Sequence, residues 1–145
     1  MSSSIVDLAR KALANEIFSY GIYSRLAELY REGPLRSKLR RIAKMEEKHA
    51  NFWIDFLKNR LHEKPQMKIN RLKLALYTIT FRILGVGLTL RMLELGEKDT
   101  VGLYSEMLNN LELKYHEKEE LKKFLRTNSF MNRNSLKRSQ GSRSF

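Results

Sequence analysis

A glutamate followed seven residues later by a tyrosine occurs twice in this chain, at an offset of 81 positions. The two pairs are Glu16 with Tyr23 and Glu97 with Tyr104. Between them, the stretch MEEKHANFW contains a Glu-x-x-His pair, Glu46 with His49. Acids and a histidine on the inward side of amphipathic helices are costly unless their charge is compensated, commonly by a bound metal ion. The sequence therefore predicts a carboxylate-bridged metal site with Glu16, Glu46, His49 and Glu97 as ligands.

The composition limits which ligands and which fold are available. The chain has no cysteine, so disulfides, zinc–thiolate sites, iron–sulfur clusters and thiol nucleophiles are excluded, and carboxylates, three histidines and backbone oxygens remain. Its 145 residues suit one domain that buries roughly two-thirds of its unfolded surface. Only two prolines and seven glycines occur in a sequence rich in Leu, Lys, Arg and Glu. These features predict an all-α fold.

Apolar residues at helical spacing predict four main helices and a helical crossover. The expected ranges are about 4–31, 35–61, 69–84 for the crossover, from there to about 111, and from about 115 through 125. Ser4 is the expected cap of the first helix, and Gly33 with Pro34 the expected stop and restart. The candidate ligands fall in rows that are otherwise apolar, which places them on the inward faces.

No segment of the sequence predicts export or a membrane span. The N-terminal MSSSIVDLARKA lacks a basic region followed by an apolar run, so a cytoplasmic location is expected, with attachment at a membrane surface left open. The most apolar stretch, Leu72 to Leu95, is interrupted by Lys73, Arg82 and Arg91. Charges at mid-bilayer depth cost about 2.5 kcal/mol or more each. We therefore expect a buried helix there.

The formal net charge of +12 raises the alternative of a metal-free basic bundle that binds nucleic acid. Its distribution disfavours that alternative. Four of the units lie in the last 19 residues, at Arg133, Lys137, Arg138 and Arg143. Much of the remainder lies on polar helix faces, for example at Arg36, Lys38, Arg40, Arg41 and Lys44. A solvated surface explains these faces without a nucleic-acid partner.

A second Glu-x-x-His pair would complete a two-metal site, because such bundles take one Glu from each of two helices and one Glu-x-x-His from each of the other two. The offset of 81 places the missing pair at positions 127 and 130, where Thr127 and Phe130 stand. Only half of the ligand set is present, so we expect weakened metal binding and impaired chemistry.

The same stretch suggests a shift of the coding frame. Reading each codon from the third base of the present one permits Glu-Leu-Ile-His-Glu-Gln-Glu here, with the motif at the expected place. Residues 126–145 are basic, rich in serine and free of acids, which predicts a disordered tail. Our hypothesis is that the authentic sequence ends near Leu125, leaving the fourth helix incomplete. Residues 4–125 would then form the domain.

Glu16 with Tyr23, Glu46 with His49, and Glu97 with Tyr104 resemble the ferritin-like di-iron carboxylate proteins, rubrerythrins in particular. The run RLKLALYTITFRILGVGLTLRMLELGEKDTVGLYSEM is similar to the rubrerythrin-like domain that precedes the membrane part of vacuolar-iron-transporter-type proteins. The resemblance covers about 5–125 and implies a ferritin-like four-helix bundle with a helical crossover between its second and third helices.

The resemblance implies iron as the cofactor, with Glu16 and Glu97 as single-carboxylate ligands, Glu46 as the bridging acid and His49 as its terminal partner. Tyr23 and Tyr104 would lie near the metals. The implied activity is oxygen or peroxide chemistry, as a peroxidase or ferroxidase, or iron handling. The alternative is a regulatory iron-sensing domain of a membrane metal transporter. The expected partners are metal ions, and a homodimer and a transporter domain in longer relatives are left open.

Overall fold

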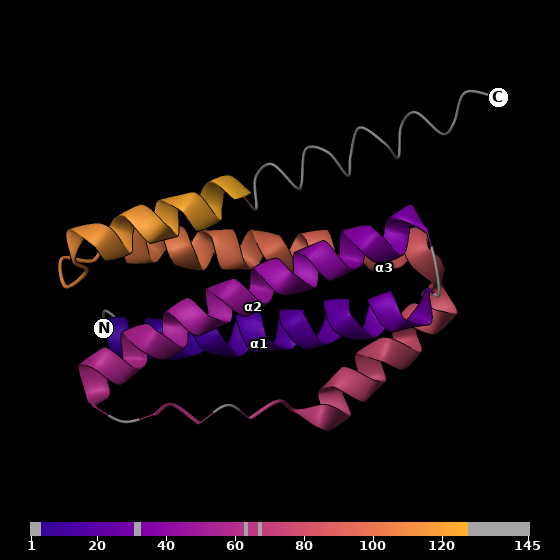
Figure 1. Ribbon diagram of the computed structural model, residues 1–145, viewed down its shortest axis with the longest axis horizontal. Helices are drawn as coiled ribbons and strands as arrows, with labels where there is room; N and C mark the ends of the chain where they lie inside the picture. The colour runs from indigo at the N-terminus through magenta and orange to yellow at the C-terminus, as the bar shows by residue number, and fades with distance from the viewer. Residues whose placement is uncertain (1–3, 31–32, 63, 67, 128–145) are drawn as a thin grey trace. The chain divides into compact units, whose positions relative to one another are not determined.

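The structure is a computed structural model that describes residues 4–30, 33–62, 64–66 and 68–127, and within these ranges it is helical with no strand (Figure 1). The helices are α1 (Ile5–Leu29), α2 (Pro34–Leu61) and α3 (Arg71–Leu108), and a further helix covers 115–127. The predicted all-α class is confirmed. The helix ends lie close to those expected from the apolar periodicity, although α3 ends at Leu108 rather than near residue 111.

Helix α1 starts where the sequence predicts a cap. The Ser4 hydroxyl oxygen accepts a hydrogen bond from the Asp7 backbone N–H at 3.1 Å, which satisfies one of the donors left open at a helix start. The Ser4 hydroxyl in turn donates to the Asp7 carboxylate at 2.7 Å. The negative charge of Asp7 in the first turn also suits the positive end of the helix dipole.

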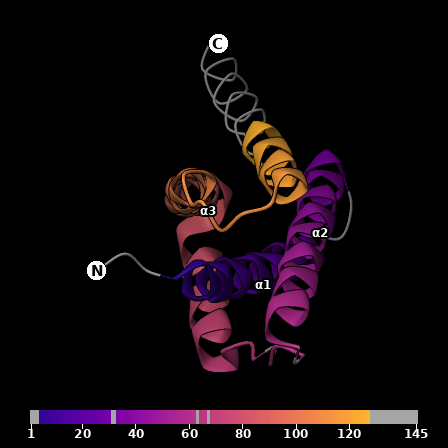
Figure 2. The same ribbon diagram turned by 90° about the vertical axis from the view of Figure 1, so that its left-hand side faces the viewer.

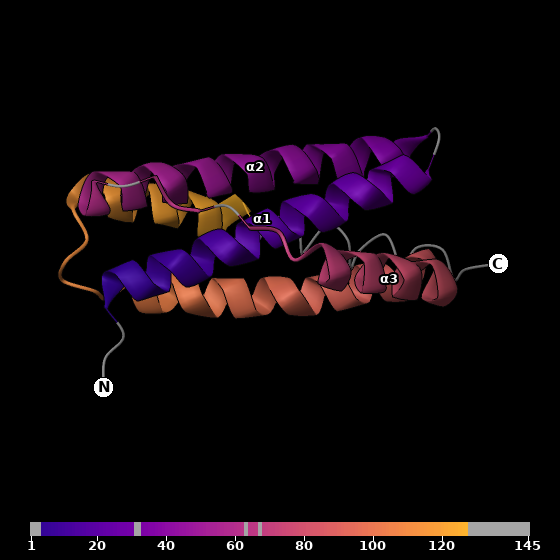
Figure 3. The same ribbon diagram turned by 90° about the horizontal axis from the view of Figure 1, so that it is seen from below.

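Helix α2 follows α1 after a short connection, so the two helices form an antiparallel hairpin (Figures 1 and 3). Gly33 precedes it with φ 105°, and Pro34 occupies its first position. Its last turn closes at His62, whose backbone N–H donates to the Lys58 carbonyl at 2.9 Å. The facing sides carry the core of the hairpin, which includes Leu8, Leu13, Ile22, Leu26, Leu39, Ile42, Trp53, Phe56 and Leu57.

The chain divides into two compact units, Met1–Leu90 and Arg91–Phe145, and α3 contributes to both. In the first unit, the beginning of α3 lies against α1 (Figure 2). The Phe18 and Tyr77 rings meet edge to face with centroids 5.2 Å apart. A Cβ atom at Gly21 would lie 3.4 Å from the Leu74 side chain, so this glycine lets α3 approach α1 closely.

Helix α3 is broken at Gly85, which has φ 78° and ψ 174°. This backbone region is open to glycine and strained for other residues. The Thr89 hydroxyl donates to the Gly85 carbonyl at 2.7 Å and lies 3.4 Å from the Phe81 carbonyl, so it supplies a donor next to the break. The predicted end of a helix near Gly85 is confirmed.

The expectation of a buried helix over Leu72 to Leu95 is wrong. Leu74 and Phe81 are buried, but Leu72, Leu76, Ile79, Ile83, Leu88, Met92 and Leu95 are exposed. Apolar residues occupy more than one side of this segment, whereas only one side of its first part packs on the hairpin. None of the described helices combines the length and apolarity needed to cross a membrane.

The second unit contains the end of α3, a turn and the helix 115–127. The turn is held by Asn110, whose side-chain oxygen accepts from the Glu112 backbone N–H at 2.9 Å. The buried apolar side chains in the described part of this unit are Leu103, Tyr104, Met107, Leu113, Leu121 and Phe124. The predicted helix from about Tyr115 is confirmed, and the predicted tail lies outside the described residues apart from Arg126 and Thr127.

Candidate metal centre

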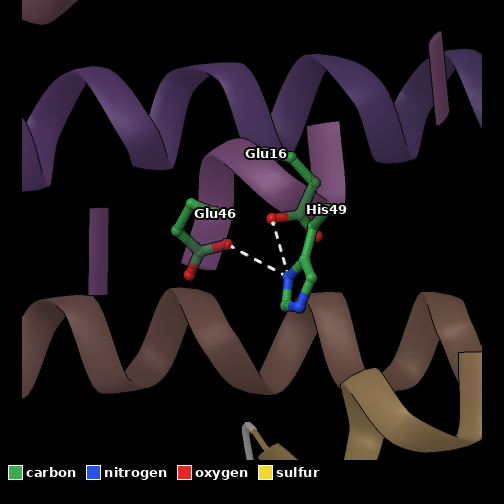
Figure 4. Close-up of side chains that lie close together, drawn as sticks. All are labelled: Glu16, Glu46 and His49. Carbon is green, nitrogen blue, oxygen red and sulfur yellow. Dashed lines mark ion pairs between the residues drawn. The ribbon is translucent and has the colours of Figure 1, made fainter. Parts of the chain in front are cut away.

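Three of the predicted ligands meet inside the helical hairpin. Glu16 comes from α1, and Glu46 and His49 come from α2, and Figure 4 shows the three side chains turned toward one another. His49 Nδ1 lies 3.6 Å from Glu16 Oε2 and 3.5 Å from Glu46 Oε2. The relative exposure is 2% for Glu16, 4% for Glu46 and 2% for His49. We call this group the triad.

The local structure explains why these side chains converge. Residues three apart on a helix share one face, so Glu46 and His49 point the same way from α2. The same face of α2 carries the buried Trp53 and Ile42, and α1 packs against it. Glu16 and the neighbouring Ile17 are both buried on α1. The packing of the hairpin that buries the apolar side chains therefore also buries the triad.

Burial and mutual contact change the proton affinity of the triad. Burial raises the pKa of the Glu46 carboxyl well above its usual value, and the neighbouring Glu16 carboxyl raises it further, while His49 lowers it. Burial lowers the pKa of His49, but the Glu16 and Glu46 carboxylates outweigh it and raise the pKa of His49 to about 9. In the metal-free protein at neutral pH, the positive charge of protonated His49 therefore offsets buried negative charge of the neighbouring carboxyls.

The arrangement fits a divalent metal ion. One ligand atom from each of Glu16, Glu46 and His49 can be chosen so that all three lie within 4.8 Å of one another. Carboxylate oxygen with imidazole nitrogen is a donor set that suits iron, manganese and zinc. Three protein ligands leave positions free on such an ion for water or a substrate. Burial within the hairpin would also shield a bound ion from bulk solvent.

The remaining predicted site residues are not members of the triad. Glu97 is half-buried on the second-unit part of α3 and does not belong to the triad. Tyr23 is buried on α1, two turns after Glu16, and Tyr104 is fully buried in the second unit with its ring centroid 6.2 Å from that of Phe124. Whether these tyrosines serve chemistry stays a prediction.

The positions expected to hold the second Glu-x-x-His pair carry no ligand. Thr127 is exposed in the last described turn, and its hydroxyl donates to the Lys123 carbonyl at 2.9 Å. Phe130 lies outside the described residues. The other two histidines, His62 and His116, are exposed.

One buried carboxylate was missed by the sequence reasoning. Glu117 is buried, and its Oε2 accepts a hydrogen bond from the Lys114 backbone N–H at 2.8 Å. This is the reciprocal half of a capping box, in which an acid at the third helical position reaches back to the residue before the helix. The signal was a Glu three residues after the end of the turn, and it indicates a structural cap.

Comparison with protein-family models, with curated proteins and with solved structures finds no match to this chain.

Proposed function

We propose that this protein binds a divalent transition metal, iron foremost, at Glu16, Glu46 and His49. The observation that carries the proposal is the burial of two carboxyls and one imidazole, from two helices, around one point with His49 Nδ1 at 3.5 and 3.6 Å from carboxylate oxygens. Burying three ionisable groups together is costly for folding alone. A bound cation with a function would explain why these three ionisable groups are buried together.

The surrounding fold in this proposal is a ferritin-like four-helix bundle, in which the first part of α3 is the crossover. The all-helical chain, the helix order and the break at Gly85 support it. Glu97 belongs to the second unit, and its role as a further ligand stays a prediction from the sequence. Without a second Glu-x-x-His pair, we expect one tightly held ion per chain rather than two.

Ferrous iron in such a centre supplies one-electron chemistry with oxygen or peroxide. The residues of this chain have distinct tasks around it. His49 would provide the neutral nitrogen ligand, and Glu46 and Glu16 would provide the two carboxylate ligands. Tyr23 would lie near the metal, where its ring would exclude water, and the corresponding role of Tyr104 stays a prediction from the sequence. The half-complete ligand set makes this chemistry impaired in the present chain.

Metal titration of two matched variants tests the proposal. Glu46→Gln removes a ligand from the triad, whereas Glu47→Gln makes the same change at an exposed neighbour on α2. Under anaerobic conditions, we expect one Fe²⁺ or Co²⁺ per chain for the wild type and for Glu47→Gln, and loss of tight binding for Glu46→Gln. Equal binding by both variants would refute the triad as the site. Two tightly held ions would contradict the half-site account.

A regulatory iron-sensing domain is the second candidate. The exposed apolar side chains of α3 favour it, because a sensor needs a surface through which its state reaches a partner. Steady-state peroxidase turnover separates the two candidates. Saturable iron binding with negligible turnover, also after Glu and His are restored at positions 127 and 130, would indicate the sensor.

A further inference from the structure

The first part of α3 presents an apolar row to solvent. Four of its exposed residues follow one another at helical steps of four and three, and one more apolar residue is exposed just before the helix begins: Leu72, Leu76, Ile79 and Ile83, preceded by Ile69. The relative exposure reaches 72% for Leu72 and 78% for Ile83. We call these five residues the outer row. A contiguous exposed apolar patch of this kind marks a docking surface.

The outer row is held outward by contacts on the other side of the helix. Leu74 and Phe81 are buried, and the Tyr77 ring meets both Phe18 and Phe81 edge to face at 5.2 and 5.7 Å between centroids. The Lys73 ammonium lies 4.6 Å from the centroid of the Phe18 ring. Turning the outer row inward would break these contacts, so the helix is fixed in its present orientation.

The charged residues around the outer row are all basic. From Lys64 to Leu93 the sequence has no acid and six basic residues, which are Lys64, Lys68, Arg71, Lys73, Arg82 and Arg91. Arg71 and Arg82, near the two ends of the row, are exposed. An apolar helix face bordered by cations is typical of a helix that lies in the plane of a membrane interface.

We propose that the outer row docks on a membrane surface rich in anionic phospholipid. The Leu and Ile side chains enter the boundary between headgroups and acyl chains, and the basic side chains extend to the phosphates. Each Lys or Arg near such a surface strengthens the attraction severalfold. A second copy of the chain is the weaker fit, because pairing two outer rows brings Arg71 and Arg82 against their own copies with no acid to offset them. This proposal does not depend on the metal centre.

Vesicle sedimentation of the full chain tests the proposal. The probes are vesicles of phosphatidylcholine alone and vesicles with about one-third phosphatidylserine, each at low and high salt. We expect binding to the anionic vesicles only, and loss of that binding at high salt. The double variant Leu76→Glu/Ile79→Glu should weaken binding at least tenfold. The double variant Arg71→Gln/Arg82→Gln should weaken it by about 20-fold, since it removes two surface cations.

Two matched controls separate the outer row from net charge and general exposure. Leu111→Glu/Tyr115→Glu introduces the same acids at two exposed apolar sites outside the row, where Leu111 is 95% exposed. Arg40→Gln/Arg41→Gln removes the same charge from an exposed face of α2. Both controls should keep more than half of the wild-type binding. Emission of the single, fully buried Trp53 reports whether each variant is folded.

Three results would overturn the proposal. Wild-type binding by the Leu76→Glu/Ile79→Glu variant would show that charge alone attracts the chain to vesicles. A wild type that ignores vesicles and elutes as a dimer, with this variant as the monomer, would assign the outer row to a second copy. A large fall in the melting temperature of this variant would show that the chain itself covers the row in solution.

Discussion

His49 Nδ1 on α2 lies 3.6 Å from Glu16 Oε2 on α1, which makes the triad a contact between two helices. Its third member, Glu46, is on the same helix as His49 at a distance of 3.5 Å. All three residues belong to the first compact unit. The centre therefore depends on the hairpin α1 and α2, and a change that loosens the hairpin should lower metal affinity even without touching a ligand.

Glu46→Gln should separate metal binding from stability. The raised pKa of Glu46 means that burial favours its neutral form, so a neutral amide of the same size costs the metal-free protein little. We expect its free energy of unfolding at neutral pH to stay within about 1 kcal/mol of the wild type. Metal affinity should fall at least about 100-fold, since loss of an outer-shell partner alone costs about 10- to 100-fold.

Denaturant unfolding with and without Co²⁺ measures both effects in one experiment. In the wild type and in the Glu47→Gln control, the ion should raise the midpoint, because a ligand that binds only the folded state stabilises it. In Glu46→Gln the midpoint should not move. A metal-free Glu46→Gln that is severely destabilised would show that the carboxylate itself supports the fold.

The metal-free protein should lose stability as pH rises from about 6.5 to about 9. The folded pKa of His49 is raised from 6.5 to about 9, so within this window the folded state holds a proton that the unfolded state has released. The stabilisation is fully present below pH 6.5 and amounts to at most about 3 kcal/mol. The raised pKa of Glu46 acts in the same direction.

Chemical unfolding at a series of pH values checks this dependence. His49→Gln should flatten the slope, whereas His116→Gln, at an exposed histidine, should leave it unchanged. The comparison uses the slope rather than the absolute stability, because His49→Gln also leaves buried carboxyls without the imidazole. A wild-type stability that rises through this pH window would contradict the assignment.

Metal binding should release protons. His49, whose pKa is raised to about 9, holds a proton in the metal-free protein at neutral pH and must lose it to offer a lone pair to an ion, and the raised pKa of Glu46 adds to the proton release. We expect roughly one to two protons released per ion, and an affinity that rises with pH up to about 9. Calorimetry in buffers of different ionisation enthalpy counts these protons, and a binding heat independent of the buffer would count against the protonated triad.

Much of the local structure could be predicted from the sequence. Three of the predicted features depend on backbone preferences that only a few residues determine. They are the Ser4 cap, the stop at Gly33 with Pro34 and the helix end near Gly85. The convergence of Glu16, Glu46 and His49 followed from their place in apolar rows, because packing that hides a row also hides the polar member within it.

The prediction that was wrong concerns contacts between helices, which no local sequence pattern determines. The segment from Leu72 to Leu95 is apolar on several sides, so composition could not reveal that only the side with Leu74 and Phe81 would find a neighbour. Glu97 occupies a comparable row and is half-buried while Glu16 is fully buried, and its role as a ligand stays a prediction. Which row of side chains becomes buried depends on the helix that packs against it. That packing is determined by residues spread over the whole chain.

Gly85→Ala should destabilise the first unit although the added methyl group meets no neighbour. A Cβ atom at Gly85 has no heavy atom within 4 Å, so the cost is conformational and arises from φ 78°. We expect a loss of about 1–3 kcal/mol in the free energy of unfolding. Gly87→Ala is the matched control, since its Cβ also meets nothing and its φ lies outside the strained range. There the substitution should be neutral or stabilising by up to about 1 kcal/mol, because alanine favours helix. If urea unfolding shows the same stability for both variants, α3 continues through position 85 without a break, and the orientation of the outer row would have to be revised.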